Sequence, residues 1–112
     1  MKKETYYILT DEATLLNPGK VSFKSTTGEP VKIKGYEKYD FFIHDVSKNE
    51  YHQYALSEGT TGLRIGGSGQ TKKEVIRNAL NILNRMSKKE LNRVIKHYVS
   101  EYGLSPKYRM NV

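Results

Sequence analysis

Apolar and polar residues alternate along the first two thirds of the chain. Val21 and Phe23 point to one side of residues 21–25, and Val31 and Ile33 repeat this pattern in residues 31–36. A period of two is typical of strands with one exposed face, and Gly/Pro-rich segments at 17–20 and 26–30 indicate turns between them. We therefore predict an antiparallel sheet of about six strands within residues 5–66, at 5–11, 21–25, 31–36, 38–45, 50–58 and 63–66.

The last third of the chain has the period of an amphipathic helix in residues 71–86 and again in 88–102. Both segments open with the same pattern, a hydroxyl residue followed by two lysines and a glutamate. In each, the hydroxyl of Thr71 or Ser87 can accept from the amide three residues on, while the glutamate can reach back to the cap amide. Gly103 and Pro106 are expected to end the second helix.

Strands followed by helices predict an α+β fold in one domain, residues 1–112, with both helices packed on one face of the sheet. The residues expected to make this contact lie on the apolar stripes of the two helices. They are Ile76, Ala79, Leu80 and Leu83 in the first helix, and Leu91, Val94, Ile95, Tyr98 and Val99 in the second.

The positive charge is concentrated in the helical part of the chain. The net charge is +7, yet residues 1–70 hold nine basic and nine acidic residues, whereas residues 71–112 hold ten and three. This asymmetry favours an acidic partner: nucleic acid, anionic lipid or an acidic protein. The sheet needs the apolar helix faces as cover, which argues against a membrane surface. We predict binding to nucleic acid, RNA favoured, or to a ribonucleoprotein, with phosphate contacts from Lys72, Lys73, Arg77, Lys88, Lys89, Arg93 and Lys96.

A glycine-rich segment, "IGGSGQTKKE" at residues 65–74, precedes the first helix. It lacks the spacing of nucleotide-binding and dinucleotide-binding loops. It resembles the final strand and helix of double-stranded RNA-binding domains, with the motif matched by Gly67, Gly69, Thr71, Lys72 and Lys73. Strands in residues 38–66 also fit that family's order, although no first helix precedes them. The resemblance implies that the paired lysines contact phosphates across a groove of A-form RNA.

A small, basic, cysteine-free α+β chain is also similar in size and character to the anti-CRISPR proteins of phages and mobile elements. This resemblance implies a stoichiometric inhibitor that occupies the guide-RNA or nucleic-acid channel of an RNA-guided nuclease. No apolar window approaches the ~18 residues of a membrane span, and residues 1–13 lack the apolar core of a signal peptide. We therefore expect a cytoplasmic protein.

The histidines offer an enzymatic alternative. If residues 46–49 close a hairpin in which Asp45 faces Tyr51, His44 faces His52 across the strands. Two such imidazoles could serve as general base and acid in metal-independent RNA cleavage, the alternative to binding alone. With no cysteine and no histidine pair at helical spacing, neither a metal nor another cofactor is expected. The main hypothesis is a protein without enzymatic activity.

Overall fold

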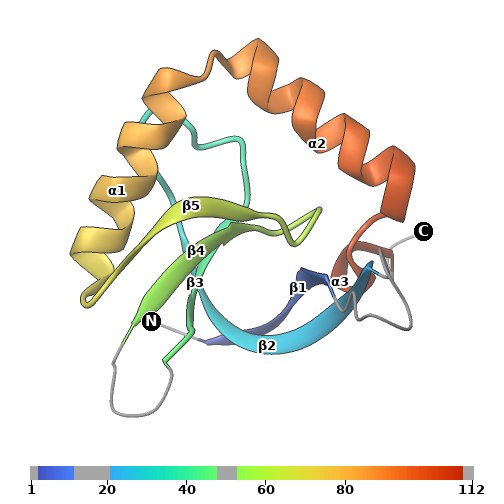
Figure 1. The fold of residues 1–112 in the computed structure, drawn as a ribbon, viewed down its shortest axis with the longest axis horizontal. Helices are drawn as coiled ribbons and strands as arrows, with labels where there is room; N and C mark the ends of the chain where they lie inside the picture. Colours follow the sequence, from blue (N-terminus) through green and yellow to red (C-terminus); the bar gives the residue numbers. More distant parts are fainter. Residues whose placement is uncertain (1–2, 12–20, 48–52, 110–112) are drawn as a thin grey trace.

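The computed structural model describes residues 3–11, 21–47 and 53–109, and it confirms the α+β fold (Figure 1). Within these residues the antiparallel sheet has five strands rather than about six, in the order β1-β2-β3-β4-β5. The elements are β1 (Glu4–Asp11), β2 (Val21–Val31), β3 (Phe41–Asp45), β4 (Tyr54–Glu58), β5 (Arg64–Gly69), α1 (Lys72–Arg85), α2 (Lys88–Tyr102) and α3 (Pro106–Arg109).

Strand β2 corrects two predictions, the turn at residues 26–30 and the strand at 31–36. It continues through both Gly28 and Pro30, pairing first with β1 and then with β3. A Cβ at Gly28 would lie 2.7 Å from Phe42 and 2.9 Å from Tyr6, whose rings stack at 4.2 Å. The glycine therefore serves close ring packing, and Pro30 lies beyond the end of β1, where β2 is an edge and proline is tolerated. The predicted turn at 17–20 falls outside the described residues.

The sheet curls until its first strand reaches the turn between β4 and β5 (Figure 1). The amide of Leu9 in β1 donates to the carbonyl of Gly62 at 2.9 Å. Gly62 has a φ of +70°, and a Cβ there would lie 2.7 Å from the carbonyl oxygen of Tyr7. Only glycine satisfies both the backbone angle and this close approach. On the same turn, the Ser105 amide donates to the Thr60 carbonyl at 2.8 Å and so attaches the C-terminal segment.

Both long helices begin where the sequence predicted. The Thr71 hydroxyl accepts from the Glu74 amide at 3.2 Å, and the Ser87 hydroxyl accepts from the Glu90 amide at 3.1 Å. The Glu74 carboxylate reaches back to the amide of Gln70, at 2.9 Å, rather than to the cap residue itself. Such caps each stabilise a helix by about 1 kcal/mol; the Thr71 cap fixes the start of α1 after β5, and the Ser87 cap fixes the corner between α1 and α2.

The end of α2 also matches its prediction. Gly103 has a φ of +80°, and its amide donates to the Val99 carbonyl at 2.8 Å. Short α3 follows and was not predicted, because Pro106 was interpreted only as a stop signal. Among the described helices, none is long and apolar enough to cross a membrane.

The main core lies between α1 and the face of the sheet formed by β3, β4 and β5. Helix α1 buries Val75, Ala79 and Leu83, whereas α2 buries only Leu91 and adds Ile95 at the margin. Helix α2 then runs across the opening between α1 and α3 instead of lying along the sheet (Figure 1). The residues expected to pack the helices on the sheet are therefore only partly correct. Ile76 and Leu80 are only partly buried, and Val94, Tyr98 and Val99 lie outside the core cluster.

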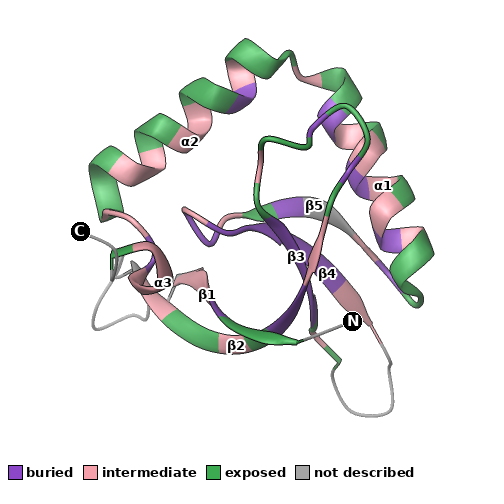
Figure 2. Ribbon diagram, turned by 180° about the vertical axis from the view of Figure 1, so that it is seen from behind, coloured by how far each residue is buried: buried purple, intermediate pink, exposed green. Residues whose placement is uncertain are grey.

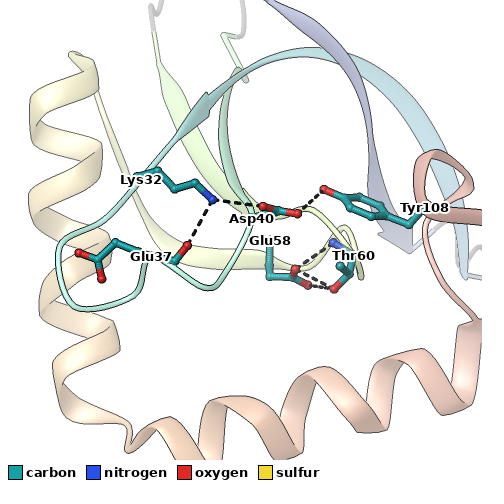
Figure 3. Close-up of polar contacts among 6 residues, drawn as sticks. All are labelled: Lys32, Glu37, Asp40, Glu58, Thr60 and Tyr108. Carbon is teal, nitrogen blue, oxygen red and sulfur yellow. Dashed lines mark hydrogen bonds and ion pairs between the residues drawn. The ribbon is translucent and has the colours of Figure 1, made fainter. Parts of the chain in front are cut away.

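Residues 32–40 connect β2 to β3 and are held in place by polar contacts. The Lys32 ammonium lies 3.3 Å from both the Glu37 carbonyl and the Asp40 carboxylate, and the Tyr108 hydroxyl donates to Asp40 at 3.3 Å (Figure 3). Nearby, the buried Glu58 carboxylate accepts from the hydroxyl and amide of Thr60. The connection is therefore anchored to α3 at one side, and it reaches the α1–α2 corner at the other.

Candidate nucleic-acid interface

All seven basic residues predicted to bind phosphate are exposed on α1 and α2. Exposed positions follow the sides of both helices that face away from the sheet (Figure 2). Lys73 and Arg77 are four residues apart on α1 and therefore neighbours on its surface, about 6 Å apart along the axis. On α2, Lys89, Arg93 and Lys96 follow one another at spacings of four and three. We call these two rows together the basic face of α1 and α2.

Four of these cations have no acidic partner among the described residues: Lys73, Arg77, Lys89 and Lys96. Their ammonium and guanidinium groups are solvated and can exchange water and counterions for a phosphate without first breaking an ion pair.

Lys72 differs from the other six basic residues in that it forms an ion pair with the sheet. Its ammonium lies 2.5 Å from the Glu29 carboxylate of β2, whose side chain is only 10% exposed. This charge-assisted hydrogen bond lowers the pKa of Glu29 and raises the pKa of Lys72. Lys72 therefore holds the first turn of α1 against β2, and its charge is largely neutralised there.

Arg93 and Lys88 also have partners within the protein. Arg93 pairs with Glu90 one turn earlier, and this hydrogen bond lowers the pKa of Glu90 and raises that of Arg93. Because the pair is exposed, a phosphate can replace the carboxylate at little cost. The Lys88 ammonium lies 5.3 Å from the centre of the Tyr36 ring, a cation–π distance.

Tyr36 belongs to a pocket of about 210 Å³ at the α1–α2 corner, between residues 35–39 and the first turns of α2. The pocket is lined by Gly35, Tyr36, Glu37, Lys38, Tyr39, Lys88 and Asn92. The hydroxyl of Tyr36 donates to the carbonyl of Leu83, at 3.0 Å, which fixes its ring beneath the pocket. The hydroxyl of Tyr39 donates to Asn92 Oδ1 at 2.6 Å, which links the β2–β3 connection to α2.

The sequence contains a signal for this pocket that the hydrophobic pattern alone does not reveal. Residues 34–39 read "KGYEKY", in which tyrosines and lysines are interleaved as in many nucleic-acid-binding surfaces. The alternation of Val31 and Ile33 placed residues 31–36 in a strand, and no role was assigned to Tyr36, Tyr39 or Asn92.

The glycine-rich segment before α1 has a structural explanation. Ala55 of β4 pairs with Ser68, but Leu56 pairs with Ile65, so Gly66 and Gly67 are extra residues that form a bulge in β5. A Cβ on Gly69 would lie 2.8 Å from the Cβ of Glu74 and 3.0 Å from the Val75 amide, which requires glycine at the entry to α1. These glycines are therefore accounted for by the bulge and by the close approach of strand and helix.

The predicted histidine pair is wrong in register. His44 faces Ala55 rather than His52, and Asp45 faces Tyr54 rather than Tyr51. His44 is buried, and its Nε2 lies 2.9 Å from the Ser57 hydroxyl. Burial lowers the pKa of His44 to about 4, so at neutral pH it is an uncharged residue packed inside the sheet. His52 falls outside the described residues.

Metal binding has no candidate in the described residues, where no three His, Cys, Asp or Glu side chains form a group that could hold an ion. Comparison of the chain with protein-family models, with curated proteins and with solved structures gives no match.

Proposed function

We propose that this protein is a non-enzymatic binder of nucleic acid, either free or within a ribonucleoprotein, and that the basic face of α1 and α2 makes the contact. The observation that carries the proposal is the set of four exposed cations without acidic partners among the described residues, Lys73, Arg77, Lys89 and Lys96. Lys88 and Arg93 add to this face, while Lys72 contributes less because it pairs with Glu29.

The basic face suits phosphate better than base edges. Its charged groups stand on the outer sides of two helices joined at a corner, a convex surface on which a backbone can lie. Lysine-rich arrays of this kind supply affinity and position without reading sequence. RNA is favoured over DNA by the resemblance of residues 67–77 to the last strand and helix of double-stranded RNA-binding domains.

Such a binder would act in the cytoplasm. The most specific version of the proposal follows the likeness to anti-CRISPR proteins. The basic face would either occupy the nucleic-acid channel of an RNA-guided nuclease or bind the guide RNA of that nuclease. In both cases the protein would inhibit the nuclease in a one-to-one complex. An excess of free RNA would then relieve the inhibition, because the same face would be occupied.

Charge reversal tests the binding proposal. A protein carrying both Lys73→Glu and Arg77→Glu is compared with a control carrying Lys3→Glu and Lys24→Glu, which has the same net charge and changes exposed residues near or on β1 and β2. Fluorescence anisotropy with a labelled RNA measures affinity. We expect the helix variant to bind at least about tenfold more weakly than the control, with its log–log salt slope reduced in magnitude by about 2.

Thermal unfolding of both variants serves as the folding control, since exposed charges contribute little to stability. Equal RNA affinity of the two charge-reversed proteins would overturn the proposal, because binding would then follow net charge rather than the α1–α2 face. Binding of no nucleic acid by the unchanged protein would overturn it as well.

A further inference from the structure

We infer that the pocket at the α1–α2 corner takes one unstacked base, so that the ligand of this protein is single-stranded RNA. The inference rests on the proposed function and specifies the form of the nucleic acid. It starts from the position of Asn92, which lines the pocket and also lies three residues after Lys89 and four before Lys96. These are neighbouring positions on a helix surface, so the pocket opens beside the basic face.

The aromatic lining of the pocket is held in place. Tyr36 is 8% exposed and anchored through its hydroxyl to α1, and the Tyr36 and Tyr39 ring centres lie 6.2 Å apart at an angle of 44°. Tyr39 is in turn backed by Phe41 at 5.9 Å. Rings fixed in this way can receive a base by stacking without losing side-chain freedom on binding.

The size of the pocket limits its occupant. About 210 Å³ is below the range of about 300–1,000 Å³ typical of sites for drug-sized ligands, so a single planar ring system fits better than a whole nucleotide. The sugar and phosphate would stay outside the pocket. At the mouth of the pocket, its lining residue Lys88 and the adjacent Lys89 in the first turn of α2 can contact the phosphates on either side of the inserted base.

Polar groups at the pocket can contact the edge of a base. The Oδ1 atom of Asn92 accepts from Tyr39, and its Nδ2 has no hydrogen-bond partner among the described residues, so this amide can donate. Glu37 accepts from the Gly35 amide through Oε1 at 3.0 Å, and its carboxylate is directed away from Asp40 (Figure 3). The hydrogen bonds to backbone amides lower its pKa, so it stays ionised and can accept from an exocyclic amino group.

A duplex cannot fill this pocket without opening. In A-form RNA the bases are stacked and paired, and recognition is limited to backbone and minor-groove groups, whereas single strands can turn a base outward onto aromatic side chains. The pocket therefore distinguishes the two forms, while the basic face alone does not.

The experiment compares a short labelled RNA strand with its blunt-ended duplex at one salt concentration. We expect the single strand to bind more tightly. Tyr39→Ala should weaken single-strand binding by about 5- to 150-fold, the range for losing one stacked base, and leave duplex binding nearly unchanged. Asn92→Ala, at an exposed position, should weaken single-strand binding without loss of fold, and Tyr39→Phe should retain most of it because the ring remains. A fluorescent base analogue within the strand should be quenched by the unchanged protein but not by Tyr39→Ala.

The outcomes separate this inference from the proposed function. If duplex and single strand bind equally, or if Tyr39→Ala and Asn92→Ala both bind the single strand as tightly as the unchanged protein, the base pocket is refuted while salt-dependent binding by the α1–α2 face stands. If Tyr39→Ala unfolds, two other results test the inference: whether Asn92→Ala binds the single strand more weakly, and whether the unchanged protein quenches the base analogue. Weaker binding of both RNA forms by the Lys73→Glu and Arg77→Glu protein, with the single-strand preference intact in the control, supports both.

Discussion

Acidification should destabilise this protein through His44, and this prediction requires no ligand. The imidazole is 4% exposed, its ring centre lies 5.2 Å from that of Phe42, and its Nε2 pairs with the Ser57 hydroxyl. Its Nδ1 is buried without a hydrogen-bond partner among the described residues. Protonation would therefore place a charge and an unpaired N–H group inside the sheet, which is costly. Burial, aided by the positive charge of Arg64 and opposed by Asp45, lowers the pKa of His44 from 6.5 to about 4.

The size of the effect follows from the two pKa values. Above pH 6.5 the histidine is neutral in both folded and unfolded chains, so its pKa shift costs the folded state nothing. Between 6.5 and about 4 the unfolded chain binds a proton that the folded protein does not, so stability falls as the pH falls. The full loss is about 3 kcal/mol, of which about 2 kcal/mol appears between about pH 7.5 and about pH 5.

Urea unfolding at about pH 7.5 and about pH 5 measures this loss before most carboxylates are protonated. The variant His44→Gln keeps a polar group toward Ser57 but cannot titrate, so its stability should change little between the two pH values, whatever its absolute stability. A His97→Gln control, changed at an exposed position on α2, should lose as much as the unchanged protein. The reasoning is refuted if His44→Gln loses the same free energy as the unchanged protein.

Two further predictions concern the helices. Glu29→Gln should free Lys72 to contact phosphate, so RNA affinity should rise. In a salt titration, the log–log slope should steepen by about 1. An unchanged slope would show that Lys72 does not contact the RNA. Leu83→Ala should cost about 2–5 kcal/mol in denaturant unfolding because that side chain is 1% exposed, whereas Leu80→Ala, at a partly buried position, should cost clearly less. Equal losses at the two leucines would contradict the packing of α1 described above.

The sequence predicted best what depends on residues close together in the chain. Both helix starts were correct because a cap at Thr71 or Ser87 is decided within four residues. The exposure of the basic helix positions also followed from local periodicity. In β2, by contrast, Gly28 and Pro30 carry a local turn signal that is overridden by pairing with β1 and β3, partners that no short window contains.

In the candidate site, too, features set by nearby residues were predicted and features set by distant residues were not. The sequence predicted the basic residues of the site but not the acidic partner of Lys72. Glu29 and Lys72 are far apart in sequence and meet only when α1 packs near β2. The corner pocket brings together Tyr39 and Asn92, which are 53 residues apart. The histidine register failed for a related reason: the position of the hairpin turn decides which residue faces His44, and turn length could not be read from residues 46–49 alone.

The salt dependence of RNA binding tests the central claim most directly. The four cations on the α1–α2 face that have no acidic partner among the described residues predict a log–log slope of about −3 on a single strand and about −4 on a duplex. Raising the salt from about 50 mM to about 200 mM should then weaken single-strand binding about 50-fold. A slope near zero, or affinity that does not change over this range, would contradict the account and show that the basic helices are only a solvated exterior.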